Sequence, residues 1–138
     1  MLNVRAAKWN RIDFPRISDD RGCLSVIQGG IDIDFDIARV YFLYDLAEGA
    51  ERAAHAHRNL HQIYLAMSGS FDVHLSDGMR TETVTLDRPN SGLVIRPGVW
   101  RRIDRFSPGA VCFVLASEIY MEEDYIRDYD EFLRYVAD

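Results

Sequence analysis

The most informative segment of the chain covers residues 49–69 and reads GAERAAHAHRNLHQIYLAMSG. His55 and His57 stand two positions apart in it, and Gly49 and Gly69 bound it. In an extended strand, residues two apart project from the same face, so both imidazole rings would line one wall. Two imidazoles on one wall can hold a metal ion together or transfer a proton together. We therefore take this pair as the centre of a candidate functional site.

Short apolar runs separated by turn residues surround this segment on both sides. Turn signals recur about every 8 to 12 residues, a spacing typical of β-sandwiches and barrels. The Asp77-Gly78 pair is a strong hairpin signal between two of these runs. The pattern predicts strands over residues 23–27, 37–44, 61–67, 70–76, 80–86, 91–96 and 110–116.

The end of the chain follows a different period. Residues 122–137 predict one helix, because apolar side chains recur there at spacings of four, three and four: Tyr125, Tyr129, Phe132 and Val136. An acidic triplet at positions 122–124 would stand at the positive N-terminal end of this helix. No repeat or linker divides the chain, so we expect a single all-β domain over residues 1–138 with a C-terminal α-helix.

Composition argues against several classes of protein. The formal net charge of −6 disfavours a nucleic acid partner, which requires a concentrated basic face. No apolar run of about 18 residues offers a membrane span, and the first residues lack the apolar stretch of a signal peptide. We therefore expect a cytoplasmic protein with no membrane partner. Cys23 and Cys112 fit no zinc-binding spacing and are expected to be small buried side chains.

Arg39 is the unusual residue of the run 37–44. The run is otherwise almost entirely apolar, as expected for a strand inside a closed barrel. A barrel interior accepts a guanidinium only beside an anion. That anion is either a carboxylate of the protein, in an internal salt bridge, or the phosphate of a ligand.

The histidine segment resembles the first sequence motif of the cupin family, with glycines and histidines at the same spacing. The fold this implies is a jelly-roll barrel, also called a double-stranded β-helix. Metal-binding cupins carry a glutamate ligand after the histidine pair and a third histidine in a second motif. This chain has Gln62 at the first of these positions and Arg101 at the second. A neutral amide is a poor ligand and a fixed cation repels a metal ion, so we expect no metal.

A closer resemblance is to the sugar 3,4-ketoisomerases, which are themselves cupins. It rests on residues 20–24, 39–41, 55–57, 60–62, 97–100, 114–117 and 124–132. The resemblance implies an isomerase of deoxysugar biosynthesis that acts on dTDP-linked 4-keto-6-deoxyglucose and moves the carbonyl from C4 to C3. It also implies acid–base catalysis without a cofactor. A neutral imidazole suits that chemistry, because near pH 7 it can take a proton from a carbon beside a carbonyl.

The resemblance also implies roles for individual residues. His57 would be the base and His55 its partner, and the donors toward the enediolate would be Tyr41 and Gln62. The diphosphate would meet three arginines at motif positions, namely Arg21, Arg39 and Arg101.

Trp100 and Arg101 lie at the end of the second cupin motif and allow more than one interpretation. Trp100 is either a packing residue at the barrel mouth or a stacking platform for the nucleotide base. Some relatives carry a histidine after this tryptophan, whereas this chain has Arg101. The sequence therefore leaves the configuration at C4 of the product open.

Three other functions stay open at this point. An epimerase of the same keto-sugar would resemble related cupins with a His–Asp dyad, but the sequence does not identify the carboxylate. A non-catalytic cupin that binds a nucleotide sugar would need the arginines but not the intact His55/His57 pair. A metal-dependent oxygenase is disfavoured by Gln62 and Arg101. The resemblance also implies a homodimer in which the segment before Arg21 is exchanged between subunits.

Overall fold

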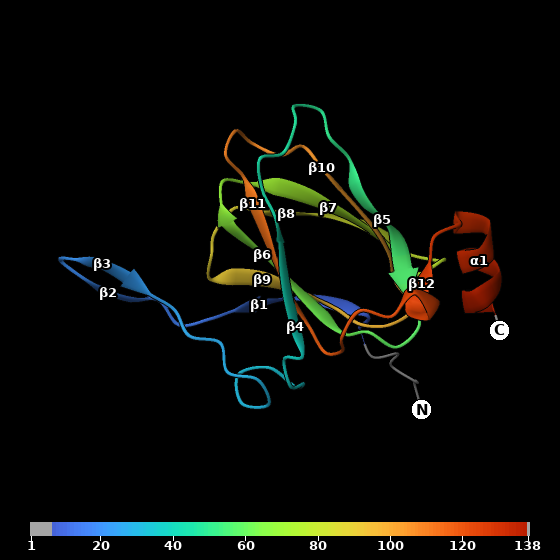
Figure 1. Ribbon diagram of the computed structural model, residues 1–138, viewed down its shortest axis with the longest axis horizontal. Helices are drawn as coiled ribbons and strands as arrows, with labels where there is room; N and C mark the ends of the chain where they lie inside the picture. The colour runs from blue at the N-terminus through green and yellow to red at the C-terminus, as the bar shows by residue number, and fades with distance from the viewer. Residues whose placement is uncertain (1–6, 138) are drawn as a thin grey trace.

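Two five-stranded antiparallel sheets face each other and form a jelly-roll barrel in the computed structural model, which describes residues 7–137 (Figure 1). In spatial order, the first sheet contains β1 (Trp9–Asp13), β9 (Ser91–Ile95), β6 (Gln62–Ser68), β11 (Val111–Ala116) and β4 (Arg39–Leu43). The second contains β12 (Tyr125–Ile126), β5 (Arg52–His57), β10 (Trp100–Asp104), β7 (Phe71–Ser76) and β8 (Thr81–Leu86). The predicted fold class, an all-β cupin barrel with a C-terminal helix, is confirmed.

The main core fills the space between the two sheets. Alternate residues of each strand point into it, as the side-chain period of two requires. In β7, for example, Phe71, Val73 and Leu75 are buried, whereas Asp72 and His74 are partly exposed on the outer face. The alternation visible in the sequence of this strand is therefore the alternation between core and solvent.

The middle of the first sheet is buried on both faces. A second apolar cluster, containing Phe14 and Ile33, covers its outer face over Ile63, Leu65 and Leu115. Strand β6 therefore lies between two apolar layers, and five consecutive residues from Gln62 are buried. This explains why the sequence of β6 is a continuous apolar run rather than an alternating one.

A two-stranded hairpin, β2 (Ile17–Asp19) and β3 (Gly22–Leu24), projects from the barrel on the side opposite the C-terminal helix (Figure 1). Every residue of the hairpin is exposed, including Cys23. The expectation that Cys23 is buried is wrong, because an isolated two-stranded ribbon has no second layer to cover it. Cys112 is buried, as predicted.

The predicted helix over residues 122–137 is correct only in its second half. Helix α1 spans Tyr129–Ala137, while Glu122–Asp124 form a 3-10 turn and β12 pairs with β5. Two contacts account for the difference. Ile126 is buried beside Ala56 and Phe132, and the Asp128 carboxylate accepts a hydrogen bond from the Glu131 backbone N–H at 3.0 Å. Asp128 thus caps the helix about two turns after the predicted start at residue 122.

The seven predicted strands are present, mostly with shifted ends, although β3 retains only the beginning of the run 23–27. Strands β1, β2, β10 and β12 are additions to that prediction, as is β5, for which only an extended conformation of the histidine pair was assumed. Charged residues interrupt the apolar pattern of β1 and β10, so their extended conformation depends on pairing with neighbouring strands. Among the described residues, no helix is long and apolar enough to cross a membrane.

Candidate active site

A cavity of about 480 Å³ opens at the edge of the barrel, where β4 of the first sheet faces β5 and β12 of the second. Its wall combines basic, aromatic and small side chains. The lining residues are Arg39, Tyr41, Leu43, Arg52, Ala53, Ala54, His55, Tyr120, Tyr125 and Arg127. The cavity therefore contains an imidazole and three guanidinium groups in a partly apolar enclosure, the usual composition of a small-molecule site.

The two histidines lie side by side at the inner end of this cavity. Their ring centroids are 4.7 Å apart and the rings are nearly perpendicular, at 83°. His55 lines the cavity, while His57 has no exposed surface and lies behind it. Tyr125 packs against both rings, with its centroid 5.0 Å from His55 and 4.4 Å from His57. The i, i+2 spacing has placed both imidazoles on one inner face, as expected.

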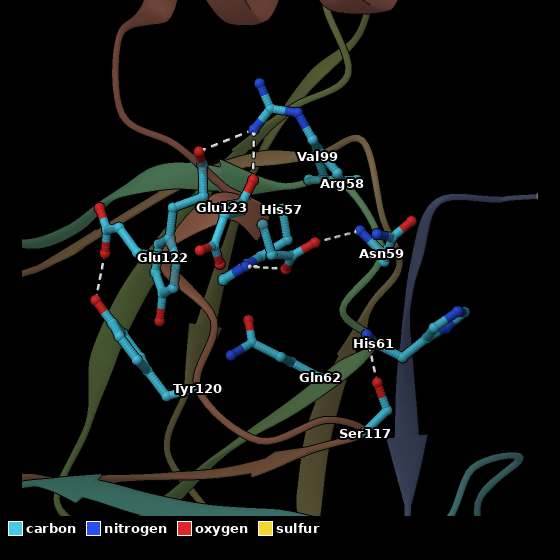
Figure 2. A network of polar contacts seen from close by, with 12 residues as sticks. His57, Arg58, Asn59, His61, Gln62, Val99, Ser117, Tyr120, Glu122 and Glu123 are labelled. Atoms are coloured by element: carbon cyan, nitrogen blue, oxygen red, sulfur yellow. Dashed lines mark hydrogen bonds and ion pairs between the residues drawn. The ribbon is translucent and has the colours of Figure 1, made fainter.

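Asp124 holds the inner histidine. His57 Nδ1 lies 2.8 Å from Asp124 Oδ2, and the Asn59 backbone N–H donates to Asp124 Oδ1 at 2.6 Å (Figure 2). A carboxylate accepts, so His57 carries its proton on Nδ1 and leaves Nε2 as a free base. The Nε2 atoms of His55 and His57 are buried and have no partner among the described residues.

The sequence did not identify Asp124, which was placed in the first turn of the predicted helix. Pairing of Tyr125 with His57 across β12 and β5 brings this carboxylate beside the imidazole instead. The one signal available was its place in the tail segment 124–132, which carried the resemblance to the ketoisomerases.

Burial keeps both imidazoles neutral. It lowers the pKa of His55 to about 2, and the positive charge of Arg101 lowers it further in the same direction. The pKa of His57 is likewise lowered to about 2, first by burial and then by Arg101. A neutral imidazole can accept a proton, so both rings are available as bases throughout the physiological pH range.

Arg101 lies beneath the cavity rather than in its lining. It is fully buried, donates to Gln62 Oε1, and lies 3.3 Å from the Tyr64 hydroxyl. Gln62 in turn donates from Nε2 to the Tyr41 hydroxyl at 3.0 Å. Burial raises the pKa of Tyr41, so this phenol stays protonated and can act as a donor. The chain Arg101–Gln62–Tyr41 thus connects a buried cation to a hydroxyl on the cavity wall.

The residues around the histidines do not fit a metal centre. The amide oxygen that would replace the usual glutamate ligand is occupied by the Arg101 guanidinium. Within residues 7–137, one group of His, Cys, Asp and Glu side chains is close enough to share a metal ion. It consists of Asp72, His74 and Asp104, on the outer face of the second sheet. There Asp104 already pairs with Arg102 at 2.7 Å.

Three arginines surround the mouth of the cavity. The buried Arg39 Nε has no hydrogen-bond partner among the described residues, and its guanidinium lies over Tyr41 and Tyr120 at 5.3 and 5.6 Å. In the part of the chain that the structure describes, Arg39 thus forms no internal salt bridge, which was one of the two interpretations of this residue. Arg127 forms a bidentate pair with Glu122, at 2.8 and 3.0 Å. Of the three, the sequence singled out Arg39 alone. Arg52 carries no motif signal, and Arg127 had only its place in the tail segment 124–132.

Two predicted substrate-binding residues, Arg21 and Trp100, do not line the cavity. Arg21 is at the tip of the projecting hairpin, where its side chain is 86% exposed and pairs with Asp19 at 2.6 Å. Trp100 packs against α1, with ring centroids 5.2 Å from Tyr129 and 5.8 Å from Phe132. Of the predicted residues, His55, Tyr41 and Arg39 line the cavity, while His57, Gln62 and Arg101 lie behind them.

A jelly-roll barrel that directs a histidine pair from β5 into a cavity at its edge places the protein among the cupins. The sequence profile of the family described as FdtA, the WxcM-like C-terminal domain, matches residues 7–137. The chain belongs to this family.

Its relatives are sugar ketoisomerases by name. The TDP-4-oxo-6-deoxy-alpha-D-glucose-3,4-oxoisomerase of Aneurinibacillus thermoaerophilus is 43% identical over 126 residues, which cover 91% of each chain. A 3,4-ketoisomerase from Helicobacter canadensis superposes with a TM-score of 0.92 at 42% identity, over 96% of this chain and 100% of that one.

A third relative was solved with a sugar nucleotide bound. It is a histidine-to-asparagine mutant of QdtA, a 3,4-ketoisomerase from Thermoanaerobacterium thermosaccharolyticum, in complex with TDP-4-keto-6-deoxyglucose. Its TM-score is 0.92 at 38% identity, with 96% of each chain covered.

Proposed function

We propose that this protein is a 3,4-ketoisomerase that converts TDP-4-keto-6-deoxyglucose to a TDP-3-keto-6-deoxyhexose. The observation that carries the proposal is a neutral imidazole, His55, on the wall of a cavity bordered by three arginines. The base suits removal of a proton beside a carbonyl, and the arginines suit a diphosphate. The names of the related enzymes supply the identity of the sugar.

The diphosphate binds at the mouth of the cavity, against Arg39 and its neighbours. A buried guanidinium nitrogen without a partner is costly, and a phosphate oxygen would complete its hydrogen bonding. Arg52 also forms no ion pair or side-chain hydrogen bond within the described part of the chain, and so is free to meet an anion. With the phosphates there, the sugar extends inward toward the histidines.

The reaction moves one proton at each of two carbons. A base takes the proton from C3, the bonding electrons form the C3–C4 double bond, and the C4 oxygen gains a proton, which gives the enediol. The C3 hydroxyl then loses its proton, the carbonyl forms at C3, and C4 gains a proton. The Tyr41 phenol, which is kept protonated by burial, stabilises the oxygen that carries negative charge between these steps.

The two histidines divide this work according to their positions. His55 lines the cavity and meets the substrate, whereas His57 is buried behind it. The geometry therefore favours His55 as the base at carbon, the reverse of the division implied by the family resemblance. His57, with Nδ1 directed to Asp124, presents its free Nε2 within the barrel and positions His55 or exchanges a proton with it.

An epimerase is the second candidate function, and the Asp124–His57 pair is the observation that favours it. This pair is the carboxylate–imidazole dyad that the sequence could not assign. An epimerase would remove and return a proton at the same carbon, without moving the carbonyl.

We further propose that the protein is a homodimer in which β2 and β3 pack on the partner subunit. The hairpin carries exposed apolar side chains, with Ile17 60% and Leu24 55% exposed. The outer face of the edge strand β4 also exposes apolar side chains, Val40 and Phe42. A monomer leaves both surfaces in water, and exchange of the hairpin would cover apolar surface in a dimer. In this arrangement, Arg21 reaches the cavity of the partner rather than its own.

The test is to incubate chelator-treated protein with TDP-4-keto-6-deoxyglucose in deuterated water and follow the sugar by NMR. We expect a 3-keto product with deuterium at C4, and the coupling constants of that product give its C4 configuration. Deuterium exchange at C3 or C5 without carbonyl migration would identify an epimerase. No exchange, with TDP still bound, would leave a non-catalytic binding protein.

A further inference from the structure

Strand β5 contains a β-bulge next to the catalytic histidine. In the register of β5 against β10, Arg101 pairs with His55 and Ile103 pairs with Arg52. The two pairs are two residues apart on β10 but three residues apart on β5. Ala53, between the two paired residues of β5, has a φ of 64°, in the left-handed region that residues with a Cβ rarely adopt. One extra residue and one left-handed residue are the usual signs of a bulge.

The bulge decides which way Arg52 faces. Residues three apart in a regular strand point to opposite faces, so a regular β5 with His55 inward would turn Arg52 outward, opposite Asp104. Directly paired residues of antiparallel strands share a face. Since Ile103 and Arg101 are both buried inside the barrel, their partners Arg52 and His55 share the face of β5 that is turned to the cavity, with His55 buried and Arg52 exposed. Both then line the cavity.

The strained backbone at Ala53 therefore lies at the point that sets the direction of Arg52. Left-handed φ values for residues with a Cβ cost free energy and persist where the surrounding structure imposes them. Here β10 pairs with β5 on both sides of the bulge, at His55 and at Arg52, and this pairing imposes it.

We propose that the bulge at Ala53 is a positioning device that turns the Arg52 guanidinium toward the substrate diphosphate, on the same wall as His55. The role of Arg52 rests on the proposed function, because it presumes that a TDP-linked sugar occupies the cavity. Ala53 lines the cavity as well, but the proposed role belongs to its backbone. Its backbone conformation acts through Arg52.

The test is a double-mutant cycle on TDP binding, measured by titration calorimetry. Arg52→Ala removes a charged contact to phosphate and should weaken TDP binding about tenfold or more. Ala53→Val introduces a β-branched residue that resists a left-handed φ, and should weaken binding by a similar factor. In the Arg52→Ala background, Ala53→Val should cause no further loss, because the side chain it positions is already absent.

Two further variants separate positioning from general damage. Ala53→Gly keeps the bulge, because glycine adopts a left-handed φ freely, and should weaken TDP binding far less than Ala53→Val does. Arg105→Val is the matched control, because Arg105 is also left-handed, with a φ of 55°, but lies outside the cavity lining. It should destabilise the protein without changing TDP affinity.

Separate results would overturn separate claims. Unchanged TDP affinity in a folded Ala53→Val variant, a tenfold loss in Ala53→Gly, or additive losses in the double variant would each refute the positioning role. If Ala53→Val does not fold, the Ala53→Gly result decides. Failure of the parent protein to bind TDP would refute the proposed function and this inference with it.

Discussion

His55 and His57 lie where water hardly reaches, and burial lowers the pKa of each imidazole to about 2. Each ring keeps a buried Nε2 atom without a partner among the described residues. In the proposed mechanism, Nε2 of His55 exchanges a proton with the substrate and Nε2 of His57 faces the barrel interior, while Asp124 keeps the other nitrogen of His57 protonated. At the scale of single residues, the site thus holds two neutral bases ready to react.

Removing the base should separate catalysis from binding. We expect His55→Asn to lower kcat by about 10²–10⁴-fold, the usual contribution of general acid–base catalysis, while the Kd for TDP changes little. The measurement is turnover by NMR together with calorimetry of TDP binding. His57→Asn is the matched comparison. Full activity in His55→Asn combined with loss in His57→Asn would assign the base to the inner ring instead.

The buried histidines should also make stability depend on pH. Their pKa values are lowered in the folded state, so below about pH 6.5 the unfolded chain binds protons that the folded chain does not. Stability is therefore present above this pH and falls as the pH drops, by about 1.4 kcal/mol per pH unit for each histidine. Urea unfolding at pH 7 and pH 5.5 measures this slope. His57→Asn should reduce it by about half, whereas an unchanged slope would contradict the assignment.

At the scale of secondary structure elements, the C-terminal segment forms one side of the site. Strand β12 brings Tyr125 into the cavity lining and Asp124 to His57, and α1 packs behind it. Phe132 of α1 has no exposed surface and contacts Ile126 of β12 within the same apolar cluster. The helix therefore supports the Asp124–His57 pair without lining the cavity.

Truncating this support should destabilise the protein. Phe132→Ala leaves a cavity against Ile126 and should lower the free energy of unfolding by about 3 kcal/mol. Leu133→Ala, at the next and partly exposed position, should cost less than about 1 kcal/mol. Urea denaturation of the two variants provides the comparison. Equal effects would show that α1 does not stabilise the β12 region.

At the scale of the whole molecule, the barrel and its projecting hairpin differ in how much of their side-chain surface is buried. The barrel has a complete core between its sheets, whereas the hairpin exposes all of its residues. Arg21, at the hairpin tip, lies outside the cavity of its own subunit. The proposed dimer unites the two by placing this arginine in the site of the neighbouring subunit.

Subunit mixing tests this arrangement. Arg21→Ala and His55→Asn homodimers should each have low activity, because each lacks one component of every site. Unfolding and refolding them together should restore about a quarter of the parent activity, since half of the dimers are mixed and each has one intact site of two. No recovery, in dimers shown to exchange subunits, would place Arg21 outside the active site.

Features that depend on local periodicity could be predicted from the sequence. The alternation in β7, the continuous apolar run of β6 and the common face of His55 and His57 follow from side-chain direction within one strand. Arg39 could be singled out because a charged group in an apolar strand requires an anion. The family resemblance added the reaction, because it depends on residues at fixed spacing.

Features that depend on pairing between distant segments could not be predicted from the sequence. Asp124 and His57 are 67 positions apart and meet only because β12 pairs with β5. Arg52 faces inward only because the register of β5 against β10 requires an extra residue at Ala53. A helical period over residues 122–137 was equally consistent with the local sequence, but burial of Ile126 beside Ala56 favours the strand. Long-range contacts of this kind gain their free energy from burial in the folded chain, which no local window of sequence contains.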